Sequence, residues 1–322
     1  RDYLDVDEEY GNISDLQNLV KKAHELNMAV VLDWVANHTA WDHPWIENNP
    51  DWYVKDASGQ IISPPGTNWN DVAELNYNNP AMRAEMIRSM KFWIEKANID
   101  GFRCDAADFV PFSFWKQAID SLKKIPNRNI ILLAEGSRND HYTAGFQMTY
   151  AWDFYGILIN VFSENESASD IFTIHKSELD AIPSNTAKLR YITNHDEYAW
   201  VNPPSLTFGS NNAALSAFVI TSFLSPSVLI YNGQEIGWPD KISFFNKNPI
   251  DWSVNQEFLN EFKNIMKART SLTRLIASTS AVSYSNNDIM AYTYQNDTIQ
   301  LLTIANTRLA SVSFVVPEAF KN

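Results

Sequence analysis

The sequence predicts an α/β protein in which parallel strands alternate with helices, followed by a smaller antiparallel β segment. Short apolar runs that end in polar residues alternate with segments of helical periodicity. This alternation favours parallel β/α units. Over residues 280–316 apolar residues alternate with period two, which indicates antiparallel strands. The 322 residues suffice for one barrel-sized domain and a smaller piece.

The predicted elements follow one another along the chain. Helices are expected where apolar residues recur at helical spacing, namely at residues 13–26, 81–97, 113–125, 167–182, 211–225 and 255–275. Strands are expected where short apolar runs end in polar residues, namely at residues 28–38, 99–105, 129–136, 148–155, 189–197 and 227–235. The segment of residues 39–80 is rich in aromatic residues, Asn and Pro. It is too long for an ordinary connection between two elements, so we expect it to be a functional excursion, a long loop with a role in the protein's function.

Composition excludes some classes of partner. A formal net charge of −13 and a pI near 4.9 argue against nucleic acid and anionic membranes, which would repel the protein. The chain lacks an apolar run of about 18 residues, so no membrane-spanning segment is expected. A single cysteine, Cys104, excludes an intrachain disulfide. Many of the aromatic residues lie in predicted loops, where they either stack on sugar rings or anchor the loops to the core.

A charged segment at residues 99–108 ends one predicted buried strand. Arg103 and Asp105 are two residues apart, so in a strand their side chains point the same way while Cys104 packs on the other face. A guanidinium beside a carboxylate keeps that carboxylate ionised. The pair is therefore either an internal structural ion pair or a nucleophilic carboxylate held in its charged form.

Polar residues that carry chemistry end several predicted strands. Asp105, Glu135 and Asp196 supply carboxyl groups, and His38 and His195 supply imidazoles. In a parallel barrel the carboxyl ends of all strands converge on one rim. Retaining cleavage of a glycoside needs two carboxyl groups about 5 to 5.5 Å apart, one as nucleophile and one as general acid and base. The sequence therefore favours such a site over three unrelated structural acids.

Four motifs occur in order, Asp33-Trp-Val-Ala-Asn37-His38, Gly101-Phe-Arg103-Cys-Asp105, Glu135-Gly136 and Asn194-His195-Asp196. They resemble the four ordered motifs of the α-amylase family of glycoside hydrolases. Residues 72–76 resemble a further motif in that family's loop domain, and residues 231–237 resemble its last barrel strand. The resemblance runs from about residue 1 to residue 275.

The resemblance implies a (β/α)8 TIM barrel. Residues 1–275 would form the catalytic barrel portion, with residues 39–80 as a small loop domain inserted after a barrel strand. Residues 276–322 would begin a C-terminal antiparallel β domain. The family's first two barrel strands would lie upstream of Arg1, so we expect the chain to be truncated at its N-terminus, because six strands alone would leave unpaired edges.

The resemblance also implies roles for the acids. Asp105 would be the nucleophile that attacks the anomeric carbon, and Glu135 would be the general acid and base. Asp196 would be the third carboxylate, which stabilises the distorted sugar and the transition state. Arg103 would hold Asp105 ionised, whereas Glu135 must carry a proton near neutral pH and so should be less solvated.

Other site residues follow from the same comparison. His38 and His195 would hydrogen-bond hydroxyls of the sugar that is cleaved, although either histidine taken alone would be read as structural. Asp33 would orient neighbouring groups rather than react. Asp108 would either line an outer sugar site or cap the following helix.

No cofactor is expected for the chemistry, but the resemblance implies a structural calcium ion. In many family members calcium joins the loop domain to the barrel through an Asn that matches Asn37 and an acid that matches Glu74. The His that usually follows the nucleophile by four residues is Phe109 here, so one expected ligand is missing. A hydrogen bond that braces the loop is the alternative for Asn37.

The sequence thus predicts a retaining hydrolase that cleaves α-1,4-glucosidic bonds in starch or maltodextrins, with an α-glucan as its partner. The alternatives are an α-glucan glucosyltransferase, an α-1,6-glucosidase and, in another class, an inactive glucan-binding protein. Polymeric starch cannot enter a cell, which favours a secreted or periplasmic protein over a cytoplasmic one if starch is the substrate. With maltodextrins as substrate, the cytoplasm stays open as well.

Overall fold

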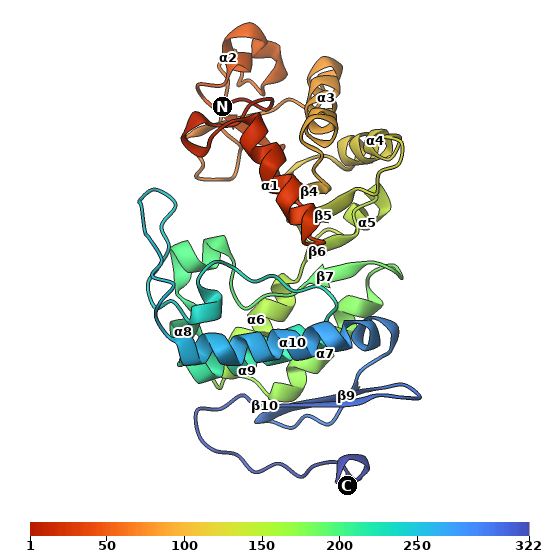
Figure 1. Cartoon of the computed structure of the whole chain (residues 1–322). Coiled ribbons are helices and arrows are strands. Elements are labelled where there is room, and N and C mark those ends of the chain that lie inside the picture. Colours follow the sequence, from red (N-terminus) through yellow and green to blue (C-terminus); the bar gives the residue numbers. More distant parts are fainter. Residues whose placement is uncertain (322) are drawn as a thin grey trace. The chain divides into compact units, whose positions relative to one another are not determined.

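The computed structural model describes residues 1–321, which divide into two units, Arg1–Thr149 and Tyr150–Asn322 (Figure 1). This division falls inside the expected barrel portion, residues 1–275, and the domain boundary expected near residue 276 stays a prediction. Asn322, the last residue of the expected β domain, lies outside the described residues.

Parallel strands form the centre of the first unit. β1 (Val31–Val35) pairs with β4 (Gly101–Asp105), β4 pairs with β5 (Ile131–Ala134), and β5 pairs with the start of β6 (Met148–Tyr150). These pairs confirm the parallel strands that the apolar runs predict. Val35 lies opposite Asp105, and Cys104 lies opposite Ala134. The carboxyl ends of these strands are therefore level, and Glu135 follows directly where β5 ends.

Helices of the first unit pack beside this sheet (Figure 1). They are α1 (Ile13–Glu25), α3 (Pro80–Ala97), α4 (Phe112–Leu122) and α5 (Asp140–Ala144). Asn12 begins α1 with a capping box, and Asn79 caps α3, which has a proline at its first position. α3 buries one face that consists mainly of Met, Ile and Trp side chains, so it is held by apolar burial against the sheet.

The excursion at residues 39–80 has its own small framework. β2 (His38–Ala40) and β3 (Val72–Glu74) form an antiparallel pair, and α2 (Pro44–Asn48) lies between them in sequence. His38 is opposite Glu74 in this pair. The buried side chains of Tyr53 and Leu75 belong to the same apolar core as the helices of the first unit. The excursion is thereby tied to the end of β1.

The second unit combines helices with an antiparallel sheet (Figure 1). Its elements are α6 (Trp152–Phe162), α7 (Ala168–Asp180), β7 (Ala187–Leu189), α8 (Pro204–Thr207), α9 (Asn211–Leu224), α10 (Gln256–Ser278), β8 (Val282–Ser283), β9 (Ile289–Gln295) and β10 (Gln300–Asn306). The strand order is β10-β9-β8, which confirms the period-two prediction. The Tyr292 hydroxyl donates to the Ile220 carbonyl at 3.0 Å, so β9 is attached to α9.

Three of the expected strands are wrong in part. The strand expected at residues 189–197 is instead β7, which ends at Leu189, followed by a single bridge at Arg190. The strand expected at residues 148–155 ends at Tyr150, because the apolar residues from Trp152 onward recur at helical spacing and form α6. The strand expected at residues 227–235 is reduced to one parallel bridge between Val228 and Arg190. Gly233, at a φ of 81°, precedes a short 3-10 helix, so the expected strand does not reach Glu235.

None of the helices within residues 1–321 combines the length and apolar content that crossing a membrane requires.

A buried polar cluster connects α6, α7 and β7 within the second unit. Arg190 forms an ion pair with Glu178, and its guanidinium lies 3.9 Å from the centre of the Phe154 ring. Arg190 Nη2 also lies 3.3 Å from Nδ1 of His175. Burial, assisted by the positive charge of Arg190, lowers the pKa of His175 to about 3. The imidazole is therefore neutral in the folded protein at neutral pH and accepts from Arg190.

His175 should make the second unit sensitive to acid. An unfolded histidine titrates near pH 6.5 and the folded one near pH 3, so between these values the unfolded state binds the extra proton. The free energy of unfolding should therefore fall as the pH drops through this window, by up to about 1.4 kcal/mol per pH unit. In His175→Gln, which keeps an acceptor but does not titrate, urea unfolding should show a flatter pH dependence; equal slopes in the two proteins would contradict this account.

Candidate functional site

One arginine contacts three carboxylates at the carboxyl ends of the first unit's strands. Arg103 Nη1 donates to Asp33 Oδ1 at 2.8 Å and to Asp105 Oδ1 at 2.7 Å. Arg103 Nη2 lies 2.5 Å from Glu135 Oε1. β4 places Arg103 and Asp105 on the same face, as the two-residue spacing predicts, and the parallel register brings the acids from β1 and from the end of β5 to this face.

Burial differs sharply within this group. The side chain of Arg103 is 9% exposed, whereas those of Asp105 and Asp33 are 25% and 57% exposed. A buried guanidinium stabilises the charged form of each carboxylate that it touches, which suits Asp105 but opposes the proton that Glu135 is expected to carry. The cation is thus shielded from water while the anions still reach solvent. This arrangement suits carboxylates that meet a substrate better than it suits a closed structural ion pair.

The backbone holds Glu135 from a second side. The Ala106 amide donates to Glu135 Oε2 at 2.8 Å, and the Ala107 amide donates to the Glu135 carbonyl at 2.9 Å. Ala106 has a φ of 43° and a ψ of 40°, in the left-handed region that residues with a Cβ rarely adopt. This turn directs the amide back toward the carboxylate, so the residue after Asp105 positions Glu135. The sequence carried no signal for this contact.

His38 lies at the start of β2, immediately after Asn37. Burial lowers the pKa of His38 from its ordinary value, although the nearby charges of Asp105 and Asp71 oppose the shift. Its ring centre is 5.4 Å from that of Trp69. A neutral imidazole beside an aromatic face and a carboxylate has a nitrogen that can hydrogen-bond a neutral ligand.

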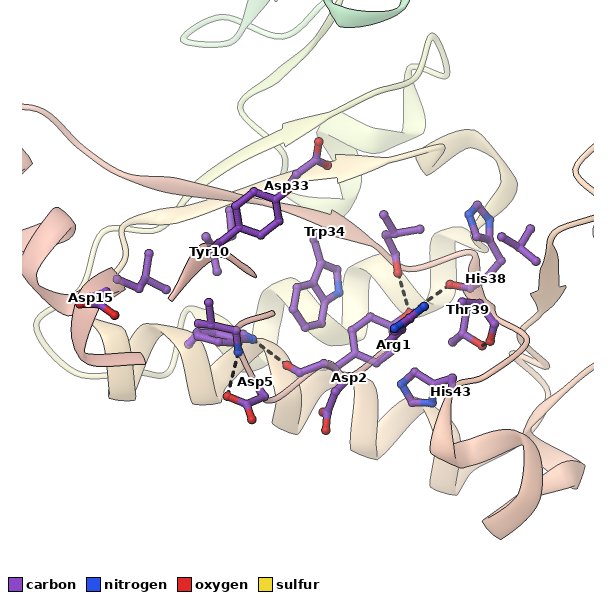
Figure 2. A pocket seen from close by; sticks show the side chains of 18 of the residues that line it. Arg1, Asp2, Asp5, Tyr10, Asp15, Asp33, Trp34, His38, Thr39 and His43 are labelled. Atoms are coloured by element: carbon purple, nitrogen blue, oxygen red, sulfur yellow. Dashed lines mark hydrogen bonds between the residues drawn. The ribbon is translucent and has the colours of Figure 1, made fainter. Parts of the chain in front are cut away.

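The pocket in Figure 2 lies along β1 and the N-terminal segment, with a volume of about 710 Å³. Trp34 and His43 line it, and Asp33 and His38 contribute to it, but Asp105 and Glu135 do not. The Tyr3 hydroxyl donates to the Val35 carbonyl at 2.7 Å. The candidate site is therefore defined by the carboxylates around Arg103 rather than by this pocket.

The second unit carries the other two predicted site residues, His195 and Asp196. Their side chains lie 3.6 Å apart, Nε2 to Oδ2, and both are partly exposed. They precede a short π-helix, Glu197–Val201, of a kind often found at functional sites. The amide of Glu197 donates to Asn194 Oδ1 at 2.9 Å, which holds the turn at Asp196.

Aromatic side chains lie together beside His195, and the sequence did not predict this cluster. The ring centres of His195 and Phe244 are 5.7 Å apart, and those of Trp200 and Phe244 are 5.4 Å apart. Trp200 comes from the π-helix and Phe244 from a loop far along the chain, so only folding brings them together. Because these two residues are far apart along the chain, no local sequence pattern predicts that they pair.

Asp108 does not cap the helix that follows it. The residue before α4 is Pro111, which has no side-chain capping bond, so the helix-cap alternative for Asp108 is wrong. The Asp108 carboxylate instead accepts from the Ser137 amide at 2.9 Å, in the loop that follows Glu135. An outer sugar site at Asp108 stays a prediction.

The two expected calcium ligands lie in the excursion's small framework, Asn37 directly before β2 and Glu74 at the end of β3. Asn37 is buried and Glu74 is half-buried, and burial raises the pKa of Glu74 above its ordinary value. No group of three His, Cys, Asp or Glu side chains within residues 1–321 is arranged to hold a metal ion. Calcium takes six to eight oxygen ligands, of which backbone carbonyls and water can supply those that these two side chains do not. Calcium binding at Asn37 and Glu74 stays a prediction, and no chemical step depends on it.

Known proteins resemble the chain over most of its length. The family model described as "Alpha amylase, catalytic domain" matches residues 1–280. Alpha-amylase 3 of Dictyoglomus thermophilum is 30% identical over 285 residues, which cover 78% of this chain and 56% of the relative. An alpha-1,4-glucan:maltose-1-phosphate maltosyltransferase of Corynebacterium glutamicum is 26% identical, with 86% and 40% covered. The chain thus spans about half the length of these curated relatives.

A solved structure supports the same assignment of fold. The maltogenic alpha-amylase AmyB of Thermotoga neapolitana matches with a TM-score of 0.84 and 27% identity, over 95% of this chain and 71% of that one. This likeness confirms the predicted fold class, an α/β barrel of the (β/α)8 type with a C-terminal antiparallel sheet.

Replacing Arg103 should destabilise the first unit. Arg103→Met removes a buried cation that contacts three neighbouring carboxylates, which should lower the free energy of unfolding by about 3 kcal/mol at pH 7. The deficit should shrink toward pH 4, because protonation removes the repulsion between the acids. Arg88→Met is the control, since it breaks an exposed pair with Glu85 and should cost less than about 1 kcal/mol. A deficit that does not change with pH in urea titrations would contradict the electrostatic explanation.

Proposed function

Because the chain belongs to the alpha-amylase family, we propose that the whole protein is a retaining glycoside hydrolase that cleaves α-1,4-glucosidic bonds in starch or maltodextrins. The observation that carries the proposal is the contact of one buried guanidinium with the two carboxylates, Asp105 and Glu135, that end neighbouring strands. Paired carboxylates of this kind are what a double displacement at an anomeric carbon requires.

The first step uses both acids at once. Asp105 attacks the anomeric carbon through a carboxylate oxygen and forms a covalent ester with the sugar. Glu135 transfers its proton to the glycosidic oxygen as the bond to the leaving sugar breaks. In the second step Glu135, now a carboxylate, takes a proton from water, and the resulting oxygen nucleophile displaces Asp105. Two inversions return the α configuration.

Arg103 suits this cycle because the charge of the acid pair stays constant. Before the first step Asp105 is charged and Glu135 is protonated; after it Asp105 is an ester and Glu135 is charged. The pair therefore carries one negative charge in both states. Arg103 contacts Asp105 through Nη1 and Glu135 through Nη2, so one fixed cation can stabilise the charge before and after it moves.

The remaining residues would act on the sugar. His38 would donate or accept a hydrogen bond with a sugar hydroxyl near Asp105, and its lowered pKa keeps it neutral for that purpose. By the family resemblance, Asp196 would stabilise the positive charge that develops at the anomeric carbon, and His195 would contact another hydroxyl. Asp33 would orient Arg103, to which it is hydrogen-bonded.

A second candidate is an α-glucan transferase or an α-1,6-glucosidase. The transferase is favoured by the name of one similar protein, the maltosyltransferase of Corynebacterium glutamicum. A solved structure that the chain resembles is the cyclic alpha-maltosyl-(1→6)-maltose hydrolase of Arthrobacter globiformis, which is 19% identical, so its likeness supports the fold alone. The same three acids would serve either activity, so the acids do not discriminate between the candidates.

Product analysis of the full-length protein separates these activities. With maltoheptaose we expect shorter maltodextrins whose first-released anomer is α by NMR, and with isomaltotriose we expect little turnover. Rapid cleavage of isomaltotriose would favour the α-1,6 alternative, and products longer than maltoheptaose would favour the transferase. A β anomer at first release would overturn the retaining mechanism.

Removing the proposed nucleophile should abolish turnover. Asp105→Asn should lower kcat on maltoheptaose by about 10⁴-fold or more, because an amide does not form the covalent intermediate. Asp120→Asn is a matched control, since Asp120 pairs with Lys116 on the exposed side of α4. Turnover that survives in Asp105→Asn would refute the assignment. A wild-type protein that binds maltoheptaose without cleaving it would instead support the glucan-binding alternative.

A further inference from the structure

We propose that Asp108 and His141 form a clamp that positions Glu135 for proton transfer. This inference rests on the proposed function, because it concerns the distance between the proposed nucleophile and the proposed acid. Asp108 follows Asp105 by three residues, in the turn Ala107–Phe109. His141 lies at the start of α5, shortly after Glu135. The clamp therefore connects the two loops that carry the reacting carboxyl groups.

The central contact of the clamp is buried and directional. Nε2 of His141 lies 2.6 Å from Oδ1 of Asp108, and the imidazole is 0% exposed. The other ring nitrogen, Nδ1, is buried and has no hydrogen-bond partner among residues 1–321. The ring proton therefore belongs on Nε2, where it is donated to the carboxylate. Burying the other ring nitrogen without a partner costs folding free energy, so the contact with Asp108 is retained at the expense of stability.

Further hydrogen bonds attach the same turn to the loop after Glu135. The Asp108 carboxylate accepts from the amide and hydroxyl of Ser137 at 2.9 and 3.1 Å. Arg138 Nη1 donates to the Asp108 carbonyl at 2.6 Å. Burial alone raises the pKa of Asp108, but the hydrogen bonds from His141, Ser137 and Arg138 outweigh it and lower the pKa to about 2. Asp108 is therefore charged near neutral pH.

Gly136 links this clamp directly to Glu135. A Cβ atom at Gly136 would lie 2.5 Å from Oδ1 of Asp108 and 2.6 Å from Nε2 of His141. No side chain fits there, so the backbone immediately after Glu135 passes against the Asp108–His141 contact. A shift of either clamp residue would be transmitted to Glu135 through a single peptide unit.

The geometry assigns a positioning role because Glu135 is held between two sets of contacts. Arg103 and the Ala106 amide hold its carboxylate, while the clamp holds the backbone that follows it. Retaining cleavage requires the two carboxyl groups to be about 5 to 5.5 Å apart. A displacement of about 1 Å can cost about 10²-fold in rate. Asp108 and His141 would thus act through Glu135 and not on the sugar itself.

The test compares substrates that differ in their need for an acid. With maltoheptaose, the leaving sugar must be protonated as the glycosidic bond breaks. With α-maltosyl fluoride, the leaving group is fluoride, which departs with little protonation. Added azide attacks the covalent intermediate in place of water and needs no general base. In the full-length protein, His141→Phe should lower kcat on maltoheptaose by about 10²-fold, with KM little changed. Fluoride release in the presence of azide should fall by less than about tenfold. His141→Gln, whose amide can still donate, should recover most of the loss.

The control is another His–Asp pair in the same unit. His24 Nε2 lies 2.8 Å from Asp100 Oδ2, before the amino end of β4 and away from the acids. His24→Phe should change neither rate appreciably. If His141→Phe does not fold, Ser137→Ala, which removes one donor to Asp108, gives the same comparison with a smaller expected loss.

Each outcome has a definite meaning. A selective loss on maltoheptaose supports the clamp, and so does its recovery in His141→Gln. Equal losses on both substrates would reduce the Asp108–His141 contact to a structural role and overturn the inference, as would unchanged rates on both. A wild-type protein that cleaves neither substrate would overturn the proposed function, which separates that failure from a failure of the clamp.

Discussion

The first unit depends on one buried cation. Arg103 is almost without solvent contact, yet it touches acids from β1, from β4 and from the end of β5. Three carboxylates would repel one another at this distance without it. The level carboxyl ends of the parallel strands bring the acids together, and the guanidinium makes their proximity tolerable. The strand register and the charge of Arg103 are therefore both required for the three carboxylates to lie side by side.

Around this cation the structure uses backbone groups where side chains would be too large. The left-handed turn at Ala106 directs an amide to Glu135, and Gly136 leaves room for the contact between Asp108 and His141. Both features lie within one or two residues of the proposed reacting acids. Strain and close packing of this kind are expected where position matters more than stability. The proposed chemistry thus relies on how tightly the two loops are joined.

Errors in the predicted fold have local causes. Residues 148–155 and 227–235 are apolar runs whose length and composition suit a strand, but helical spacing after Trp152 ends the first early, and a 3-10 helix follows Gly233 before the second reaches Glu235. The positions of Asp105 and Glu135 at strand ends were predicted correctly. A charged residue directly after a short apolar run is visible in the sequence, and it marks the point where the buried strand ends. Asp196 was expected at a strand end in the same way, but β7 ends at Leu189, so that placement is wrong, and the role of Asp196 stays a proposal.

The sequence by itself determined the alternation of helices and strands, the family resemblance and the acids at the strand ends, since these follow from periodicity and local motifs. Only the tertiary structure decided which acids Arg103 contacts, because its three partners are separated along the chain and are brought together by the strand register. It also excluded the helix cap that local rules allow for Asp108. A contact with His141, 33 residues away, depends on loop packing that no local pattern encodes.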